Sequence, residues 1–362
     1  FVVWFWGDTL QVQEESNIKL NNFGAAQMLE VNWSMGKSKP EKREVKGIYL
    51  TAYSAASPKV RAYAIDLINK TELNAVIIDI KDYSGYVLYD SELPLVNELG
   101  TEKHRLVNIR NIINEFHNND IYVIARQTVF QDPVLAEVKK GLSIKSKYGG
   151  IWRDHKGLAW VDPTQREVWN YNIAIAREAM KFGFDEINFD YVRFPSDGDM
   201  SAVLYTNGEK EKHEVMHDFF QRLSDKLSSG SAWLSIDTFG FVMERHDGMW
   251  IGQRLEDATD YIDYICPMMY PSHYPSGHLG LANPADNPTI VFENGMAKGM
   301  PYFEGKRAQA RPWIQAFDLG SNYRDGDKIR AQIDAVEKYT DGGWLIWDAS
   351  NRYTTAGLKL VE

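Results

Sequence analysis

From residue 46 onward, short apolar runs alternate with longer stretches in which apolar residues recur every three or four positions. The stretches predict amphipathic helices, four of which cover residues 60–69, 107–118, 164–181 and 213–227. The runs predict eight β-strands at residues 46–53, 75–82, 121–127, 184–195, 232–237, 261–270, 311–318 and 343–348. This alternation favours an α/β fold, a (β/α)8 TIM barrel. A doubly wound open sheet is the alternative, although no glycine-rich phosphate turn follows the first strand.

The fourth predicted strand has two unlike faces, because polar and apolar residues alternate in it until Pro195. Side chains alternate across a strand, so Ile187, Phe189 and Tyr191 share one face while Asp190 lies on the other. In a parallel barrel the apolar face packs on helices, and the C-terminal end of each strand opens on the active-site mouth. We therefore expect Asp190 at the mouth.

Residues 1–45 are predicted to be an N-terminal extension, and residues 46–362 the barrel domain. The extension ends in the charged run Lys37–Glu44, which predicts a solvated linker. Its first residues, Phe1–Trp6, are apolar but too few to span a bilayer. They are compatible with the end of an export leader or anchor, so we expect a secreted or envelope-attached protein outside the cell.

The charge balance narrows the choice of partners. A formal net charge of -10 and a pI near 5.4 argue against nucleic acid and anionic membranes, because those partners reward excess Lys and Arg. A neutral or cationic substrate fits better. Aromatic residues make up 13% of the chain and supply the flat faces that carbohydrate sites need. The single cysteine, Cys266, excludes a disulfide framework and a cysteine-based zinc site.

Carboxylates stand at the C-terminal ends of several predicted strands, at Asp79, Asp190, Asp237, Asp318 and Asp348. In a barrel this placement gathers them around one mouth, although an Asp at a strand end also commonly caps the next helix. Glycoside hydrolysis usually needs two carboxyl groups, and Asp190 and Asp237 on neighbouring strands are the natural pair. We predict Asp190 as nucleophile or base, and Asp237 as a general acid whose pKa burial has to raise.

Other residues at strand ends or in mouth loops are predicted to bind the sugar. They are Tyr53, Tyr270, Tyr274 and Trp347 as aromatic platforms, and Asp79, Asp82, Arg126, Arg193, His273, Gln315 and Asp348 as polar contacts. For Trp347 the alternative is a position facing the helices. Arg193 either holds Asp190 in its ionised form or makes a surface salt bridge. His273 either binds a sugar hydroxyl or fixes its own loop.

Four motifs carry a resemblance to a known family: Val76–Asp82, Phe189–Pro195, Pro267–Tyr274 and Gly343–Trp347. By these motifs, the chain resembles a bacterial family of glycoside-hydrolase-like TIM-barrel domains of unknown specificity over roughly residues 45–360. The resemblance implies a (β/α)8 hydrolase-like barrel and supplies no substrate.

A more distant resemblance fails at one position. The segment Asp185–Val192 is similar to the strand-four signature of the family 18 chitinases, Asp-x-x-Asp-x-Asp-x-Glu, in which Asp190 matches the last Asp. Val192 stands where that signature has its catalytic Glu, and a valine cannot donate a proton. The acid is therefore expected from another strand. In the α-amylase-like barrels, which the chain also resembles distantly, the nucleophile ends strand four and the acid ends strand five, in agreement with Asp190 and Asp237.

A competing motif is His213-Glu214-Val215-Met216-His217, an H-E-x-x-H pattern that would place two zinc ligands on one helical face. In that reading Glu214 is the general base. No third ligand follows at the metzincin spacing, and Val215, Phe219 and Leu223 form the buried stripe of an outer barrel helix. A zinc metallopeptidase is the lesser alternative.

Together the patterns predict a glycoside hydrolase that cleaves a bacterial cell-wall or extracellular polysaccharide without a metal or other cofactor. Neither a nucleic acid nor a protein partner is inferred. The main alternative is a catalytically silent barrel that binds a glycan, since a fold does not imply a function.

Overall fold

The structure is a computed structural model that describes residues 38–361. Its barrel strands are all parallel and follow the order β10-β11-β1-β2-β3-β5-β7-β8, and β8 pairs with β10 to close the barrel. The strands are β1 (Val45–Leu50), β2 (Ala75–Lys81), β3 (Tyr122–Thr128), β5 (Glu186–Asp190), β7 (Trp233–Phe239), β8 (Tyr264–Met268), β10 (Trp313–Gln315) and β11 (Gly343–Trp347). The short β9 (Gln309–Ala310) also pairs with β8. The predicted (β/α)8 TIM barrel is confirmed.

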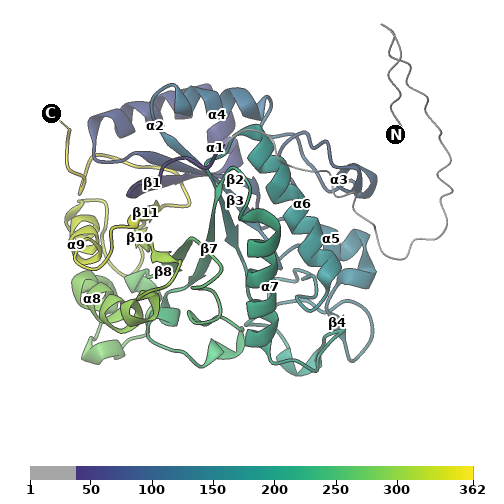
Figure 1. Cartoon of the computed structure of the whole chain (residues 1–362). Helices are drawn as coiled ribbons and strands as arrows, with labels where there is room; N and C mark the ends of the chain where they lie inside the picture. Colours follow the sequence, from purple (N-terminus) through teal and green to yellow (C-terminus); the bar gives the residue numbers. More distant parts are fainter. Residues whose placement is uncertain (1–37, 362) are drawn as a thin grey trace, which may run out of the picture. The chain divides into compact units, whose positions relative to one another are not determined.

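Helices surround the strands in Figure 1, where α6 lies beside α7 and α8 beside α9. The longer helices are α2 (Pro58–Lys70), α4 (Ile109–His117), α6 (Arg166–Phe182), α7 (Lys212–Leu227), α8 (Pro288–Gly299) and α9 (Asp327–Val336). The shorter ones are α1 (Ala52–Ala56), α3 (Pro94–Leu99) and α5 (Pro133–Val138). The four predicted helices match α2, α4, α6 and α7. Within residues 38–361, no helix combines the length and apolarity that a membrane crossing requires.

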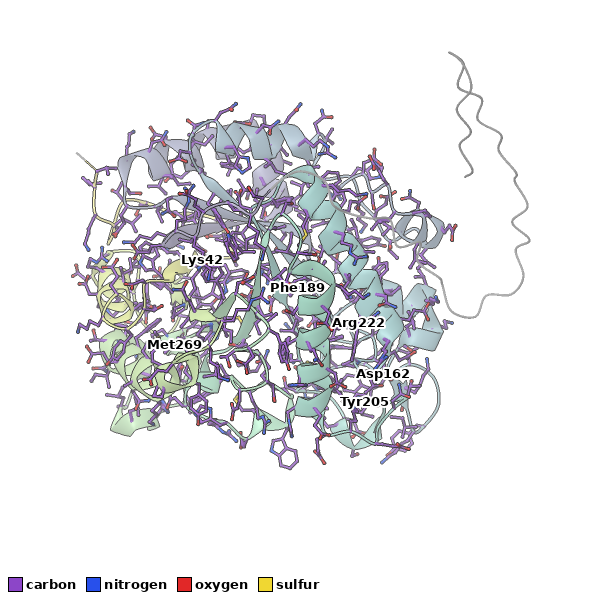
Figure 2. All side chains as sticks on the ribbon, viewed as in Figure 1. Lys42, Asp162, Phe189, Tyr205, Arg222 and Met269 are labelled. Carbon is purple, nitrogen blue, oxygen red and sulfur yellow. The ribbon has the colours of Figure 1, made fainter. Side chains whose placement is uncertain are left out.

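The loops that follow β3 and β5 meet in a small antiparallel sheet of β4 (Lys145–Ser146) and β6 (Val203–Leu204). Figure 2 labels Asp162 and Tyr205 in this region, and the Asp162 carboxylate accepts a 2.6 Å hydrogen bond from the backbone of Thr206. The ring of Trp160 lies 6.1 Å from that of Tyr191, the residue after β5. The long excursion after β3 is therefore packed at the C-terminal end of the barrel.

The alternation along each strand separates two apolar clusters. Outward residues pack against the helices, among them Ile187 and Phe189, which is labelled in Figure 2. Inward residues form a second cluster inside the barrel that includes Tyr49, Ile124 and Cys266. Because parallel strands of this kind are buried on both faces, a strand such as β2 is apolar along most of its length.

A buried ion pair closes the N-terminal end of the barrel, and we call Arg311 and Glu186 the floor pair. Nη1 of Arg311 lies 2.9 and 2.8 Å from the two carboxylate oxygens of Glu186, and both side chains are fully buried. Arg311 Nε donates to the carbonyl of Gly342 at 2.8 Å, and the Tyr122 hydroxyl donates to Glu186 at 3.1 Å. One cation thus meets one carboxylate, and additional hydrogen bonds hold both.

The end of the predicted linker lies against the same floor. Trp233 Nε1 donates to the carbonyl of Pro40 at 3.0 Å, and the Lys39 ammonium lies 4.3 Å from the centroid of the Trp233 ring and 3.6 Å from the Asp263 carboxylate. Lys39 and Pro40 are therefore half-buried against the floor, because the Lys39 cation finds an aromatic face and a carboxylate, while Ser38, Glu41, Lys42 and Glu44 stay exposed as predicted for a solvated linker. The rest of the predicted extension, up to residue 37, lies outside the described residues, and the boundary at residue 45 stays a prediction.

Candidate active site

A cavity of about 480 Å³ opens at the C-terminal ends of the barrel strands. Its wall combines charged groups with aromatic rings and consists of Arg126, Asp190, Tyr191, Arg193, Asp237, Phe239, Gly240, Phe241, Met268, Tyr270, His273, Tyr274, Trp313 and Trp347. The loop after β7 can approach β8 because Gly240 has no side chain, since a Cβ there would lie 2.5 Å from the Met268 carbonyl oxygen. The position and the size are typical of ligand sites in TIM barrels.

Arg126 on β3 is the centre of the charged part, and with Asp79, Asp190 and Asp237 it forms what we call the mouth cluster. Its Nη1 donates to Asp79 at 2.6 Å, its Nη2 donates to Asp190, and its Nε lies 3.5 Å from an oxygen of Asp237. All four side chains are buried. All four occupy inward-facing positions towards the C-terminal ends of adjacent strands, where Asp79 is in register with Arg126 and Asp190 lies opposite Thr128, two positions further along. A single cation therefore faces three carboxyl groups.

Asp237 is the member of the mouth cluster best suited to hold a proton. Its Oδ1 accepts hydrogen bonds from Trp313 Nε1 at 2.7 Å and from Asn188 Nδ2 at 2.9 Å. Burial raises the pKa of Asp237 to about 7 and the charge of Asp190 adds to the rise, while Arg126 and the two donors oppose it. A carboxyl pKa near neutrality is what a general acid requires.

Asp190 ends β5 and is held from two sides. The backbone N–H of Tyr191 donates to its Oδ1 at 2.6 Å, and Arg126 donates to its Oδ2. Tyr191 has a φ of 53°, a left-handed conformation that is uncommon for a bulky residue. The chain therefore leaves the strand directly after Asp190, five residues before the predicted end of the strand. This turn brings Tyr191 to the cavity wall.

The cation that pairs with Asp190 is Arg126, and Arg193 forms neither of its two expected contacts, an ion pair with Asp190 or a surface salt bridge. Arg193 makes no hydrogen bond to Asp190, and its Nη1 donates to the carbonyl of Phe194 at 3.0 Å. Its guanidinium lies 4.7 Å from the centroid of the Phe239 ring. Because the chain turns after Asp190, spacing along the sequence no longer places Arg193 beside that carboxylate. The partner comes from the adjacent strand instead.

Trp347 lies on the cavity side of β11, so the position facing the helices is excluded. Its ring stacks on Tyr49 with centroids 4.0 Å apart and meets Trp313 edge-on at 5.5 Å. Tyr270 and His273 also line the cavity. Burial lowers the pKa of His273, which favours a neutral imidazole at pH 7. These residues offer a sugar both ring faces and polar groups.

Asp79 and four further predicted binding residues are not part of the cavity wall, and two of the four cap turns. Asp79 lies behind Arg126 and accepts a 2.5 Å hydrogen bond from the Tyr49 hydroxyl. Asp82 accepts from the backbone of Ser84 at 2.9 Å, after a register shift in β2 between Asp79 and Lys81. Asp348 follows the inward Trp347 and therefore faces away from the cavity, where it accepts from the backbone of Ser350 at 2.9 Å.

The other two residues outside the wall are Tyr53 and Gln315. Tyr53 is 59% exposed, and the guanidinium of Arg105 lies 4.8 Å from its ring centroid. Gln315 fixes the loop after β8, because its side-chain oxygen accepts from the backbone of Ser272 at 3.1 Å. Asp318, expected at the mouth with the other strand-end acids, is exposed and pairs with Arg324 at 2.8 Å.

Trp313, Phe239 at the C-terminal end of β7 and Phe241 in the loop after it line the cavity but are absent from the predicted set. The spacing of two residues between Trp313 and Gln315 was an available signal, since it places both on one face of the strand. Phe241 had no such signal, because its position depends on how the loop after β7 folds over the barrel.

The H-E-x-x-H motif lies on α7, outside the cavity wall. Glu214 accepts a hydrogen bond from the backbone of Glu211 and completes a capping box at the start of the helix. His213 faces Asp257 at 3.5 Å, and His217 faces the Tyr261 hydroxyl at 3.1 Å. Each side chain thus has a structural contact.

One metal-capable group was found in the described part of the chain, and it does not include the H-E-x-x-H motif. It consists of Asp90, Glu102 and His104, which lie outside the cavity wall.

A closed parallel barrel with several carboxyl groups and an aromatic cavity at its mouth defines a glycoside-hydrolase-like TIM barrel. The chain belongs to the family described as "Putative glycosyl hydrolase domain", which matches residues 47–353. The resemblance drawn from the four motifs is therefore confirmed. Val192, the position at which the chitinase signature fails, is fully buried in the apolar cluster outside the barrel.

Solved structures share the fold. The glycoside hydrolase domain of PgaB (BpsB) from Bordetella bronchiseptica is 13% identical with a TM-score of 0.60, and the match covers 85% of this chain and 95% of that one. The GH20 exo-β-N-acetylglucosaminidase from Vibrio harveyi, in complex with N-acetylglucosamine, is 12% identical with a TM-score of 0.54, over 84% of this chain and 50% of that one.

A hypothetical protein from Ruminiclostridium thermocellum ATCC 27405 is 42% identical over 52% of this chain and 96% of that one, with a TM-score of 0.49. Among curated proteins, no sequence matches this chain.

Proposed function

We propose that the protein is a glycoside hydrolase that cleaves a bacterial cell-wall or extracellular polysaccharide. Asp190 acts as nucleophile or general base, and Asp237 acts as general acid. Asp237 gives its proton to the glycosidic oxygen as the bond from that oxygen to the anomeric carbon breaks. The anomeric carbon gains an oxygen either from Asp190 or from a water molecule that Asp190 deprotonates.

The observation that carries the proposal is that two carboxyl groups in one aromatic cavity have different environments. Asp190 is paired with Arg126, which suits the role that needs an anion. Burial and the charge of Asp190 raise the pKa of Asp237 to about 7, so Asp237 retains its proton at neutral pH far more readily than an ordinary Asp. Two neighbouring carboxyl groups in such different environments can take different roles, one as the acid and the other as the nucleophile or base.

The cavity wall supports a sugar as the ligand. Trp347, Trp313 and Tyr270 present rings beside the two carboxyl groups, and neutral His273 can donate or accept a hydrogen bond. The family description and the glycoside hydrolase neighbours support the same reaction class.

The test is incubation with a panel of bacterial cell-wall and extracellular polysaccharides, with measurement of new reducing ends. We expect the wild-type protein to release them from at least one polymer, and Asp190→Asn to bind that polymer without cutting it. The anomer that is released first reports retention or inversion. A wild-type protein that binds a polymer of the panel but never releases reducing ends supports the silent glycan-binding barrel instead.

We also propose that the protein acts outside the cytoplasm, because polymers of this kind lie there. Fractionation of the producing cells tests this, and recovery of the protein from the cytoplasm alone would contradict it.

A further inference from the structure

Four cationic side chains are buried in the part of the chain that the structure describes: Lys81, Arg126, Arg193 and Arg311. Three of them have carboxylate partners, which are Asp132 for Lys81, the acids of the mouth cluster for Arg126, and Glu186 for Arg311. Among residues 38–361, no carboxylate oxygen lies within 4.0 Å of the Arg193 guanidinium nitrogens. Arg193 is thus the buried cation that no carboxylate contacts in this part of the protein. Burial lowers the pKa of Arg193, although Asp190, Asp197 and Asp154 lie near enough to oppose the fall.

Few protein groups accept hydrogen bonds from Arg193. Its Nη1 donates to the carbonyl of Phe194 at 3.0 Å and contacts the Ser196 hydroxyl at 3.4 Å. No hydrogen bond joins Nε or Nη2 to the described residues, and neither atom is among their fully buried unpaired ones, so both remain accessible to a ligand. A guanidinium carries five N–H donors in a planar fork, so most of its donor capacity is left over.

Aromatic rings hold the Arg193 guanidinium in place. It lies 4.7 Å from the Phe239 centroid, 5.0 Å from that of Trp160 and 5.4 Å from that of Tyr191. Cation–π contacts of this kind fix the plane of the guanidinium but do not use its N–H groups. The left-handed φ of 53° at Tyr191 is the backbone distortion that places this ring, and such distortions gather at functional sites.

A buried charge without a partner is costly, and proteins generally keep one only where something else supplies the missing charge. Arg193 lines the same cavity as Asp190 and Asp237, so a bound ligand is placed to supply it. The planar fork matches a carboxylate with two parallel hydrogen bonds, a geometry that a single sugar hydroxyl does not offer.

We infer that Arg193 determines specificity for a sugar chain that carries carboxylate groups, such as a uronic acid unit, next to the bond that is cleaved. The statement about the cleaved bond rests on the proposed function. The statement about carboxylate binding depends only on the cavity. It departs from the neutral or cationic substrate that the net charge of -10 favours. The net charge acts on diffusing ligands over about one Debye length, roughly 8 Å at physiological salt, whereas Arg193 acts in direct contact.

The test is a binding measurement by calorimetry in the Asp237→Asn background, so that no probe is consumed. The probes are short oligomers of galacturonic acid, glucuronic acid and mannuronic acid, each paired with the same oligomer after chemical reduction of its carboxyl groups. We expect at least one acidic oligomer to bind about ten- to a hundredfold more tightly than its reduced counterpart. Arg193→Gln removes this preference, and Arg193→Lys retains part of it because the charge stays while the fork is lost.

Arg153→Gln is the matched control, because this mouth-loop arginine is exposed and pairs with Glu137. It leaves the preference unchanged. Equal affinity for acidic and reduced oligomers overturns the inference, and so does a preference that survives Arg193→Gln, or a panel in which no acidic oligomer binds. Glucose 6-phosphate and a sulfated oligosaccharide serve as further probes. If only these bind tightly, the inference that the recognised group is a carboxylate is overturned. If Arg193→Gln does not fold, Arg193→Lys replaces it, and equal affinity for acidic and reduced oligomers overturns the inference without any Arg193 variant.

Failure of the inference differs visibly from failure of the proposed function. A wild-type protein that cleaves neutral and acidic polymers equally well keeps the function and loses the inference. One that binds acidic oligomers through Arg193 but never releases reducing ends keeps the inference as a binding site and loses the hydrolase.

Discussion

Both ends of the barrel interior hold a buried arginine, and the two arginines differ in how many carboxyl groups surround them. In the floor pair, Arg311 meets one carboxylate, and both oxygens of Glu186 accept from its Nη1. In the mouth cluster, Arg126 is shared by Asp79, Asp190 and Asp237. The floor is balanced in charge and the mouth is not.

The imbalance explains why the chemistry is proposed at the mouth. Three carboxyl groups around one cation cannot all ionise easily, so the most buried and least directly paired of them, Asp237, keeps a proton. In the floor pair, by contrast, one carboxylate meets one cation, and both of its oxygens accept from Arg311. The contribution of this pair is to hold the barrel together at the end opposite the cavity.

The largest effect should come from Asp237→Asn, which removes the proposed acid from the mouth cluster. We expect kcat to fall about a hundred- to ten-thousandfold, because an amide cannot donate the proton. The free energy of unfolding should be unchanged or higher, since the variant removes excess buried negative charge. Steady-state kinetics on the cleaved polymer and chemical denaturation measure the two quantities. Retention of most of the activity would show that another group is the acid.

Glu186→Gln makes the matching change at the floor. It leaves Arg311 buried without a counter-charge, so the free energy of unfolding should fall by about 3–5 kcal/mol. The kcat of the folded fraction should stay at the wild-type value, because the floor pair does not touch the cavity. The double variant Glu186→Leu with Arg311→Met should recover most of the stability. A large loss of kcat with little loss of stability would break the distinction between the two ends.

The pH dependence of stability sharpens the comparison. The pKa of Asp237 is raised from an unfolded value near 4 to about 7. Between about pH 4 and about pH 7 the folded protein therefore holds a proton that the unfolded chain has released from Asp237. Its contribution to stability is complete below about pH 4, is lost as the pH rises towards 7, and is constant above that. The free energy of unfolding of the wild type, minus that of Asp237→Asn, should fall by at most a few kcal/mol as the pH rises across this range. Chemical denaturation at a series of pH values measures this difference. The kcat/KM of the wild type should decline above about pH 7. A flat difference would contradict the assignment.

The smallest effects should come from a pair of Tyr→Phe changes. The Tyr49 hydroxyl donates to Asp79 at the mouth, and the Tyr122 hydroxyl donates to Glu186 at the floor. Each change removes one hydrogen bond to a buried carboxylate and should cost about 1–3 kcal/mol of stability. Only Tyr49→Phe should also change kcat/KM, by a few-fold, because Asp79 shares Arg126 with the proposed catalytic pair. Equal kinetic effects in both variants would argue against a special role for the mouth cluster.

The barrel was predictable because apolar spacing is a local property. The strand that ends at Asp190 shows this well, since its alternating faces place Ile187 and Phe189 outward and Asp190 inward without any knowledge of the neighbouring strands. The same spacing led to Asp237. It failed for Asp82 and Asp348, where a register shift in one strand and an offset of a single residue in the other turn the carboxylate away from the cavity.

What the sequence by itself determined is the (β/α)8 barrel, the family, and the identity of the carboxyl groups that end its strands. The tertiary structure decided which charges meet. Arg126 pairs with Asp190 from the adjacent strand, while Arg193, only three residues along the chain from Asp190, is turned into a cage of aromatic rings. The physical reason is that electrostatic interactions depend on distance in space and on burial. Neither can be read from sequence spacing once the chain leaves a regular strand.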